Sequence, residues 1–226
     1  MSDETQTPSP AARHLDLFLI RHGNAKKLLG ETYVTAPLTE LGRAQANVTG
    51  EYFKQEEISF AGYYCSPLKR AIETATWIGE PIAQSPEIRA GIQEMEYREF
   101  PATIAAELFA RTGLMNRYFE EHIGKALRYP MIGRVADGML KILAPHSCGR
   151  IAVVVHGGVI SSVLAWYFPR ERRRWWRETV GNCSITRLEI SDGRATLHEY
   201  DSVAHLGALA KTAHERNYSL SGDQGV

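Results

Sequence analysis

Two short apolar runs, each followed by His-Gly, limit what this chain can fold into more than any other feature. Residues 17–20 precede Arg21-His22-Gly23, and residues 151–155 precede His156-Gly157. Runs this short and continuous are typical of strands covered on both faces, as in the parallel part of an α/β sheet. The carboxyl ends of such strands share one edge, where ligands bind. We therefore expect both strands to be adjacent at the sheet centre, with both imidazoles at that edge.

The residues at the end of the first run are suited to binding an anion. The Arg21 guanidinium can hold two phosphate oxygens at once, and the His22 imidazole can act as a nucleophile or an acid–base group near neutral pH. Gly23 lets the chain turn close to a bound group. Taken alone, these residues are better explained as a strand end with a solvated arginine and a capped histidine. The repetition at His156 favours the functional interpretation.

Length and charge exclude several classes of protein. A chain of 226 residues is long enough for one α/β core and short for two. Its 26 basic and 26 acidic residues balance, which argues against a nucleic-acid or anionic-membrane surface as its main function. The basic, aromatic stretch 170–177 could bind nucleic acid, but a solvated helix face is the better interpretation. No stretch approaches the ~20 apolar residues that a membrane span requires.

The cysteines indicate neither a disulfide framework nor a metal site. Cys65, Cys148 and Cys183 are far apart, and no two of them form a Cys-x-x-Cys pair. No cluster of His, Asp and Glu has the spacing of metal ligands. We therefore expect no metal, no cofactor and a cytoplasmic location.

The remaining pattern predicts a three-layer α/β/α sandwich with a mostly parallel central sheet. Thr39 is a good N-cap by residue type, and Pro67 suits the first turn of a helix. The predicted elements after the first strand are a helix at 39–56, a strand at 60–66, a helix from Pro67 that carries Arg70, an irregular stretch at 80–100, helical segments over 101–144 with breaks near Gly113, Gly124 and Pro130-Met131, a helix at 159–168, and a hairpin of 183–190 and 194–200.

The domain boundaries follow from this pattern. Residues 1–13 are polar and read as a disordered tail, residues 14–207 as one domain, and residues 208–226 as a polar C-terminal segment. Within the domain, residues 101–144 are expected to form a helical cap or side wall.

Several motifs, in order from about residue 15 to 206, make the chain resemble the histidine phosphatase superfamily, which includes the cofactor-dependent phosphoglycerate mutases. The resemblance rests on the segments 19–23 (LIRHG), 37–46 (PLTELGRAQA), 66–75 (SPLKRAIETA), 155–159 (VHGGV), 182–186 (NCSIT) and 204–206 (AHL). It implies a phosphoglycerate mutase-like fold.

The resemblance also implies roles for individual residues. His22 is the nucleophile that becomes phosphorylated, and Arg21, Arg70 and His156 hold the phosphoryl oxygens. An acidic residue after the second helix protonates the leaving oxygen and then activates water. Asn24, Thr39 and Gly157 join the substrate-binding residues.

The chemistry supports these roles independently. A transferring phosphoryl group spreads negative charge over three oxygens, so it needs an in-line nucleophile and fixed positive donors. Arg21, Arg70 and His156 can supply those donors without a metal. His22 must keep one ring nitrogen unprotonated, so we expect the other to donate to a backbone carbonyl.

The acid and the substrate are less well specified. The family often follows the acid with a Gly-x-Trp-Glu-Gly-like run, which segment 92–101 lacks. Glu94 aligns best as the acid, and Glu96 is its rival. The favoured function is a phosphomonoester hydrolase acting on a small molecule. The alternatives are a mutase, a protein phosphohistidine phosphatase and a regulatory phosphate-binding domain without turnover; the oligomeric state stays open.

Overall fold

A single sheet organises the described part of the protein. The computed structural model describes residues 13–26, 35–94, 124–176 and 178–214, and within the helix at 124–143 it describes side chains from Met131 onward. The strands are β1 (His14–Arg21), β2 (Gly62–Cys65), β3 (Glu87–Ile88), β4 (Cys148–Val155), β5 (Ile185–Ser191) and β6 (Arg194–Ser202). They lie in the order β3-β2-β4-β1-β5-β6.

The prediction that the two His-Gly strands are central neighbours is confirmed. β1 and β4 pair in parallel, with Arg21 opposite Val155 at their carboxyl ends. β2 pairs in parallel with β3 and β4, whereas β5 runs antiparallel to β1 and β6 antiparallel to β5. The sheet is therefore mostly parallel, and the residues after β1 and β4 leave it side by side.

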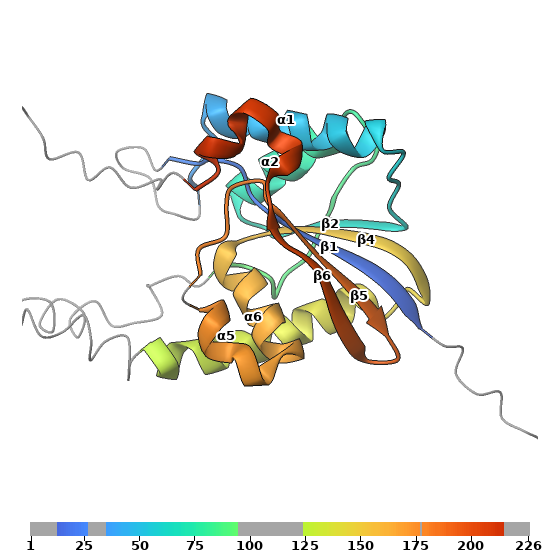
Figure 1. The fold of residues 1–226 in the computed structure, drawn as a ribbon, viewed down its shortest axis with the longest axis vertical. Coiled ribbons are helices and arrows are strands. Elements are labelled where there is room, and N and C mark those ends of the chain that lie inside the picture. Colours follow the sequence, from blue (N-terminus) through green and yellow to red (C-terminus); the bar gives the residue numbers. More distant parts are fainter. Residues whose placement is uncertain (1–12, 27–34, 95–123, 177, 215–226) are drawn as a thin grey trace, which may run out of the picture.

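Helices cover both faces of this sheet (Figure 1). They are α1 (Glu40–Gln55), α2 (Lys69–Gly79), α5 (Gly124–Leu143), α6 (Gly157–Tyr167), α7 (Arg172–Trp175) and the 3-10 helices η3 (Pro169–Glu171) and η4 (Ala204–Thr212). Figure 1 shows α1, α2 and the C-terminal helix on one side and α5 and α6 on the other. The three-layer α/β/α prediction is confirmed.

The sequence of β1 explains why both faces need a cover. Leu15, Leu17 and Leu19 point into the core cluster that contains α5 and α6 side chains. Phe18 and Ile20 point into the opposite cluster, with side chains of α1 and α2. Alternation along a strand places successive side chains on opposite faces, so a strand that is apolar at nearly every position is stable only between two layers.

The break predicted near Pro130-Met131 is wrong, because α5 continues from Gly124 to Leu143. A proline lacks one backbone donor and normally kinks a helix interior. Here packing outweighs that loss: Met131, Val135 and Met139 follow one helix face and are buried in the core with Ile142. The part of the predicted cap at 101–123 lies outside the described residues, as does the tail at 1–12.

The chain remains packed beyond residue 207, where the sequence suggests the start of a polar C-terminal segment. There η4 runs to Thr212 and Ala213 is fully buried; residues 215–226 lie outside the described part. The stretch at 80–100, which the sequence predicts to be irregular, contains the short strand β3, which pairs with β2. Residues 95–100 of this stretch are not described.

The predicted hairpin is present, and its turn residues Asp192 and Gly193 both have positive φ.

In the ranges that the structure describes, no helix is both long and apolar enough to cross a bilayer.

Candidate active site

His22 lies buried directly after β1 and has its tautomer set by two hydrogen bonds. Its Nδ1 lies 2.8 Å from the carbonyl oxygen of Gly23, which can only accept, so Nδ1 carries the proton. Its Nε2 accepts a hydrogen bond of 3.1 Å from Nε of Arg70 on α2. The contact to a backbone carbonyl anticipated from the sequence is therefore present. Nε2 carries a lone pair and faces a guanidinium.

His156, the second predicted imidazole, lies beside the first. The ring centroids of His22 and His156 are 5.2 Å apart. His156 Nε2 lies 2.8 Å from Oγ of Ser66, which follows β2. His156 Nδ1 is buried and has no hydrogen-bond partner among the described residues. An unpaired buried polar atom costs about 1–3 kcal/mol, so this nitrogen is well placed to bind an oxygen of a ligand.

Arg21 and the segment after α7 complete the same edge. The Arg21 guanidinium donates through Nη1 to the carbonyl oxygen of Val180. A Cβ built on Gly157 would lie 3.9 Å from Arg21 Nε, so the guanidinium is close to the first turn of α6. Asn182 Nδ2 donates to the carbonyl oxygen of His22 over 3.0 Å. Residues near 180 thus fix the backbone and side chain at the end of β1.

Asn24 and Thr39 lie together at the start of α1. Thr39 is the N-cap, as predicted, and its Oγ1 accepts from the backbone N–H of Gly42. The same hydroxyl donates to Asn24 Oδ1 over 2.8 Å. A Cβ on Gly42 would fall 2.0 Å from the Asn24 carbonyl oxygen, so only glycine allows the helix to approach this loop. Asn24 is two residues beyond His22, so this contact ties the start of α1 to the loop that follows β1.

Of the two acid candidates, the structure describes Glu94. Its side chain extends to the first turn of α6. Its Oε2 accepts a hydrogen bond of 3.1 Å from the backbone N–H of Gly158. Gly158 is two residues after His156, so the carboxylate approaches the same sheet edge as both imidazoles. Glu96 lies outside the described residues.

Burial and positive charge keep both imidazoles neutral. Burial lowers the pKa of His22 well below its usual value, the charges of Arg70 and Arg21 lower it further, and the hydrogen bond to Gly23 opposes them. Burial likewise lowers the pKa of His156, followed by the influence of His22 and the arginines. A neutral His22 that is unprotonated at Nε2 is the form required of a nucleophile.

These buried histidines should make stability depend on pH. Burial also lowers the pKa of His205, to about 4. An unfolded histidine takes up a proton near pH 6.5, whereas the folded ones take it up only at lower pH. The stabilisation is therefore complete above pH 6.5 and is lost as the pH falls. We expect the free energy of unfolding, measured by urea titration, to decrease below pH 6.5 by about 1.4 kcal/mol per pH unit for each of His22, His156 and His205.

A matched variant tests the origin of this slope. His205→Gln removes one titrating histidine, so its slope between pH 6.5 and 5 should be shallower than that of the wild type by about 1.4 kcal/mol per pH unit. A wild-type protein equally stable at pH 7 and pH 5 would contradict the assignment.

Sequence reasoning missed several residues that support the site. Thr74 Oγ1 accepts a hydrogen bond from the backbone N–H of Gly23, and the spacing of four from Arg70 on one helix could have revealed it. Asn182 lay within a noted motif but received no role. Arg134, which binds the segment carrying Glu94, has no local signal because its partners are more than forty residues away.

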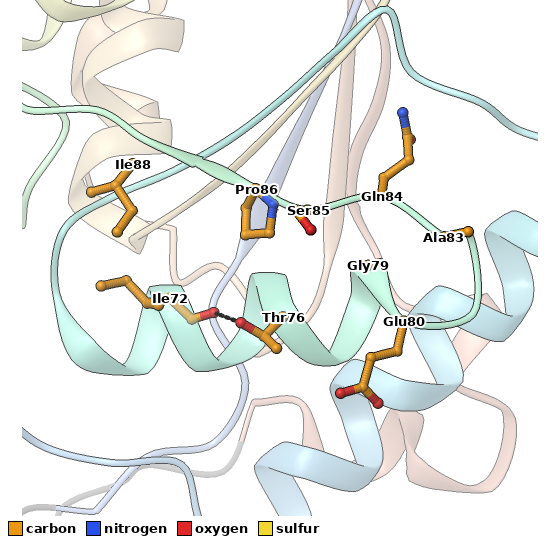
Figure 2. Close-up of a pocket in the computed structure, with 9 residues that line it drawn as sticks. All are labelled: Ile72, Thr76, Gly79, Glu80, Ala83, Gln84, Ser85, Pro86 and Ile88. Carbon is orange, nitrogen blue, oxygen red and sulfur yellow. Dashed lines mark hydrogen bonds between the residues drawn. The ribbon is translucent and has the colours of Figure 1, made fainter.

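A separate pocket of about 410 Å³ lies between α2 and the segment 83–88 (Figure 2). Figure 2 shows Ile72 and Thr76 of α2 facing Pro86 and Ile88 across it. Its described lining includes none of the side chains around His22, so we do not place the function there. The described residues also contain no group of three or more His, Cys, Asp or Glu side chains that could hold a metal ion.

Comparisons with known proteins agree on one family. The family model of the histidine phosphatase superfamily (branch 1) matches residues 17–202. The uncharacterized phosphatase PhoE of Bacillus subtilis (strain 168) is 25% identical over 85% of this chain and 97% of its own. The metal-independent phosphoserine phosphatase of Arabidopsis thaliana is 24% identical over 86% of this chain and 84% of its own.

A solved structure shows the same fold. The crystal structure of phosphoglycerate mutase from Bacillus anthracis str. Sterne superposes with a TM-score of 0.69 at 22% identity, covering 89% of this chain and 98% of that one. Both phosphatases and a mutase are thus similar to this chain.

Proposed function

Because the chain belongs to the histidine phosphatase superfamily, we propose that it is a phosphomonoester hydrolase that forms a phosphohistidine on His22. The observation that carries the proposal is the hydrogen bonding of His22, with Nδ1 protonated toward the Gly23 carbonyl and Nε2 facing Arg70. A substrate oxygen that accepts the Arg70 N–H would leave the Nε2 lone pair directed at phosphorus.

The first half of the reaction transfers the phosphoryl group. Nε2 of His22 attacks phosphorus, and the bond from phosphorus to the ester oxygen breaks. Glu94 gives its proton to that oxygen, so the alcohol leaves neutral. Arg21, Arg70 and His156 hold the three phosphoryl oxygens, whose negative charge the two guanidiniums offset.

The second half restores the enzyme. The Glu94 carboxylate takes a proton from a water molecule, whose oxygen attacks the phosphohistidine. The bond from phosphorus to Nε2 breaks, inorganic phosphate leaves, and both His22 and protonated Glu94 are regenerated. Glu94 therefore acts as acid and then as base, with no net change in protons on the enzyme.

We propose a small phosphorylated molecule as substrate and the cytoplasm as location. The phosphoserine phosphatase among the relatives supports the substrate class. Because the fold is also similar to that of a phosphoglycerate mutase, phosphoglycerates should be tested as substrates too. All three cysteines, Cys65, Cys148 and Cys183, are free thiols, which suits a reducing compartment.

The test follows both phosphate release and product identity. The protein is incubated with phosphoserine, 3-phosphoglycerate, sugar phosphates, nucleotides and a phosphohistidine peptide, and phosphorus NMR records the products. Hydrolysis of a small ester to inorganic phosphate supports the proposal. Isomerisation of 3-phosphoglycerate without net phosphate release would indicate a mutase, hydrolysis of the peptide alone a protein phosphatase, and binding without turnover a regulatory domain.

We also expect hydrolysis to need no metal ion. In the proposed mechanism the phosphoryl oxygens are held by the guanidiniums of Arg21 and Arg70 and by the neutral imidazole of His156, which no chelator removes. The rate of p-nitrophenyl phosphate hydrolysis should therefore change by less than about two-fold after dialysis against EDTA, since the phosphoryl charge is held by side chains. Activity that disappears in EDTA and returns with a divalent cation would refute this.

A further inference from the structure

Arg134 of α5 grips the segment that carries Glu94. Its Nη1 donates to the carbonyl oxygen of Gly91 over 3.0 Å and to Oε1 of Gln93 over 3.2 Å. Its Nη2 donates to the backbone carbonyl of Gln93 over 2.9 Å. A planar guanidinium reaches several acceptors in one fixed arrangement. The Gln93 carbonyl belongs to the peptide bond that leads into Glu94.

The same segment is seated on α5 by close packing. Ile92 is fully buried, and the backbone N–H of Gly91 donates to Gln93 Oε1 over 2.7 Å. Gly91 has a φ of +91°, and a Cβ on the facing Gly138 would lie 3.0 Å from the Gly91 carbonyl carbon. The approach of segment and helix therefore depends on the absence of a side chain at 138.

Glu94 is held at its other end by α6, where Gly158 donates to its carboxylate. The backbone on one side of the residue and the carboxylate on the other are thus both tied to helices. We propose that Arg134 is a positioning residue that sets the Glu94 carboxyl for proton transfer. This inference rests on the proposed function, in which Glu94 is the proton donor.

A general charge effect is the rival explanation, and the structure offers a control for it. Arg134 lines a pocket of about 620 Å³ together with Arg89 and Lys141. Lys141 lies on the same helix and carries the same charge, but it is exposed. Lys141→Ala therefore removes a cation from this pocket without touching the segment of Glu94. Arg134→Lys keeps the charge at 134 and removes the planar fork.

The experiment compares two substrates that differ in their need for an acid. An alkyl phosphate leaves as a basic alkoxide and needs protonation, whereas p-nitrophenyl phosphate needs little. In both Arg134→Ala and Arg134→Lys we expect kcat for the alkyl phosphate to fall about 10- to 100-fold, because a misplaced acid loses most of its contribution to catalysis. We expect kcat for p-nitrophenyl phosphate to fall by less than about 3-fold, because its leaving group needs little protonation. KM should stay nearly constant, and Lys141→Ala should behave as wild type.

Gly138→Ala provides a second route to the same displacement. The added methyl group pushes the segment away from α5 and leaves the Arg134 side chain intact. We expect the same selective loss with the alkyl phosphate. Thermal unfolding of each variant, and labelling of His22 by a phosphate donor, establish that the fold and the nucleophile are retained.

The outcomes separate this inference from the proposed function. If Glu94→Gln shows the selective loss while all the position 134 and 138 variants slow both substrates equally, or neither, the positioning role is overturned and the hydrolase mechanism stands. Full alkyl phosphatase activity in Arg134→Lys also overturns it. If Glu94→Gln itself shows no selectivity, the assignment of the acid fails and the inference fails with it.

Discussion

Replacing His22 with Ala is expected to abolish turnover and the covalent intermediate together. His22 accepts a hydrogen bond from Arg70 through its unprotonated ring nitrogen. In the proposed mechanism this nitrogen is the nucleophile, and the phosphoenzyme cannot form without it. We expect kcat to fall by more than about 10⁴-fold, as when a catalytic nucleophile is removed. The intermediate is detected as acid-labile, base-stable label from a radioactive phosphate donor.

A matched histidine on the sheet surface controls for this substitution. His198 contacts Glu189 on the neighbouring strand and is 39% exposed, so His198→Ala should retain both label and turnover. Label that persists in His22→Ala would move the nucleophile elsewhere. The neighbouring imidazole of His156, 5.2 Å away between ring centroids, would then be the first residue to test.

Glu94→Gln is expected to discriminate between leaving groups. The amide keeps the size of the side chain but cannot donate a proton to an alkoxide. Hydrolysis of an alkyl phosphate should slow by about 10² to 10⁴-fold, the usual contribution of a general acid. Hydrolysis of p-nitrophenyl phosphate should slow far less. The measurement is kcat for both esters over the same pH range.

Two other carboxylates make the test specific. Glu87 is exposed and paired with Arg89 on the same stretch of chain, so Glu87→Gln should leave both rates unchanged. Glu96 is the rival acid from the sequence. Equal slowing of both substrates in Glu94→Gln counts against its role, and selective slowing in Glu96→Gln would transfer the role to that residue.

The sheet and the meeting of the two histidines could be predicted from the sequence, because both rest on local signals. Apolar runs that end in His-Gly identify buried parallel strands, and parallel strands bring their carboxyl ends to one edge. The N-cap Thr39 and the hairpin turn at Asp192 and Gly193 likewise depend on residues close in the chain.

The supporting contacts could not be predicted, because they join distant segments. Asn182 and His22 are 160 residues apart, and no sequence pattern within either segment predicts the hydrogen bond between them. Pro130 misled for the same reason: its local preference is to break a helix, and the packing of α5 on the core overrides it. Local propensity is a weak guide wherever tertiary contacts decide the conformation.

The parallel pairing of β1 with β4 has a consequence for how activity arises during folding. The proposed nucleophile, His22, follows the first strand of the sheet. Its partner imidazole follows a strand that comes much later in the chain, and the two strands pair from His14 opposite Cys148 to Arg21 opposite Val155. Strand pairs that are far apart in the sequence form slowly, because a long loop must close, at a cost in entropy, before any stabilising contact can form. No early hairpin or isolated helix pair can contain both imidazoles. A chain synthesised only as far as α5 lacks β4 and His156, so the proposed phosphate-transfer centre is incomplete until β1 and β4 have paired.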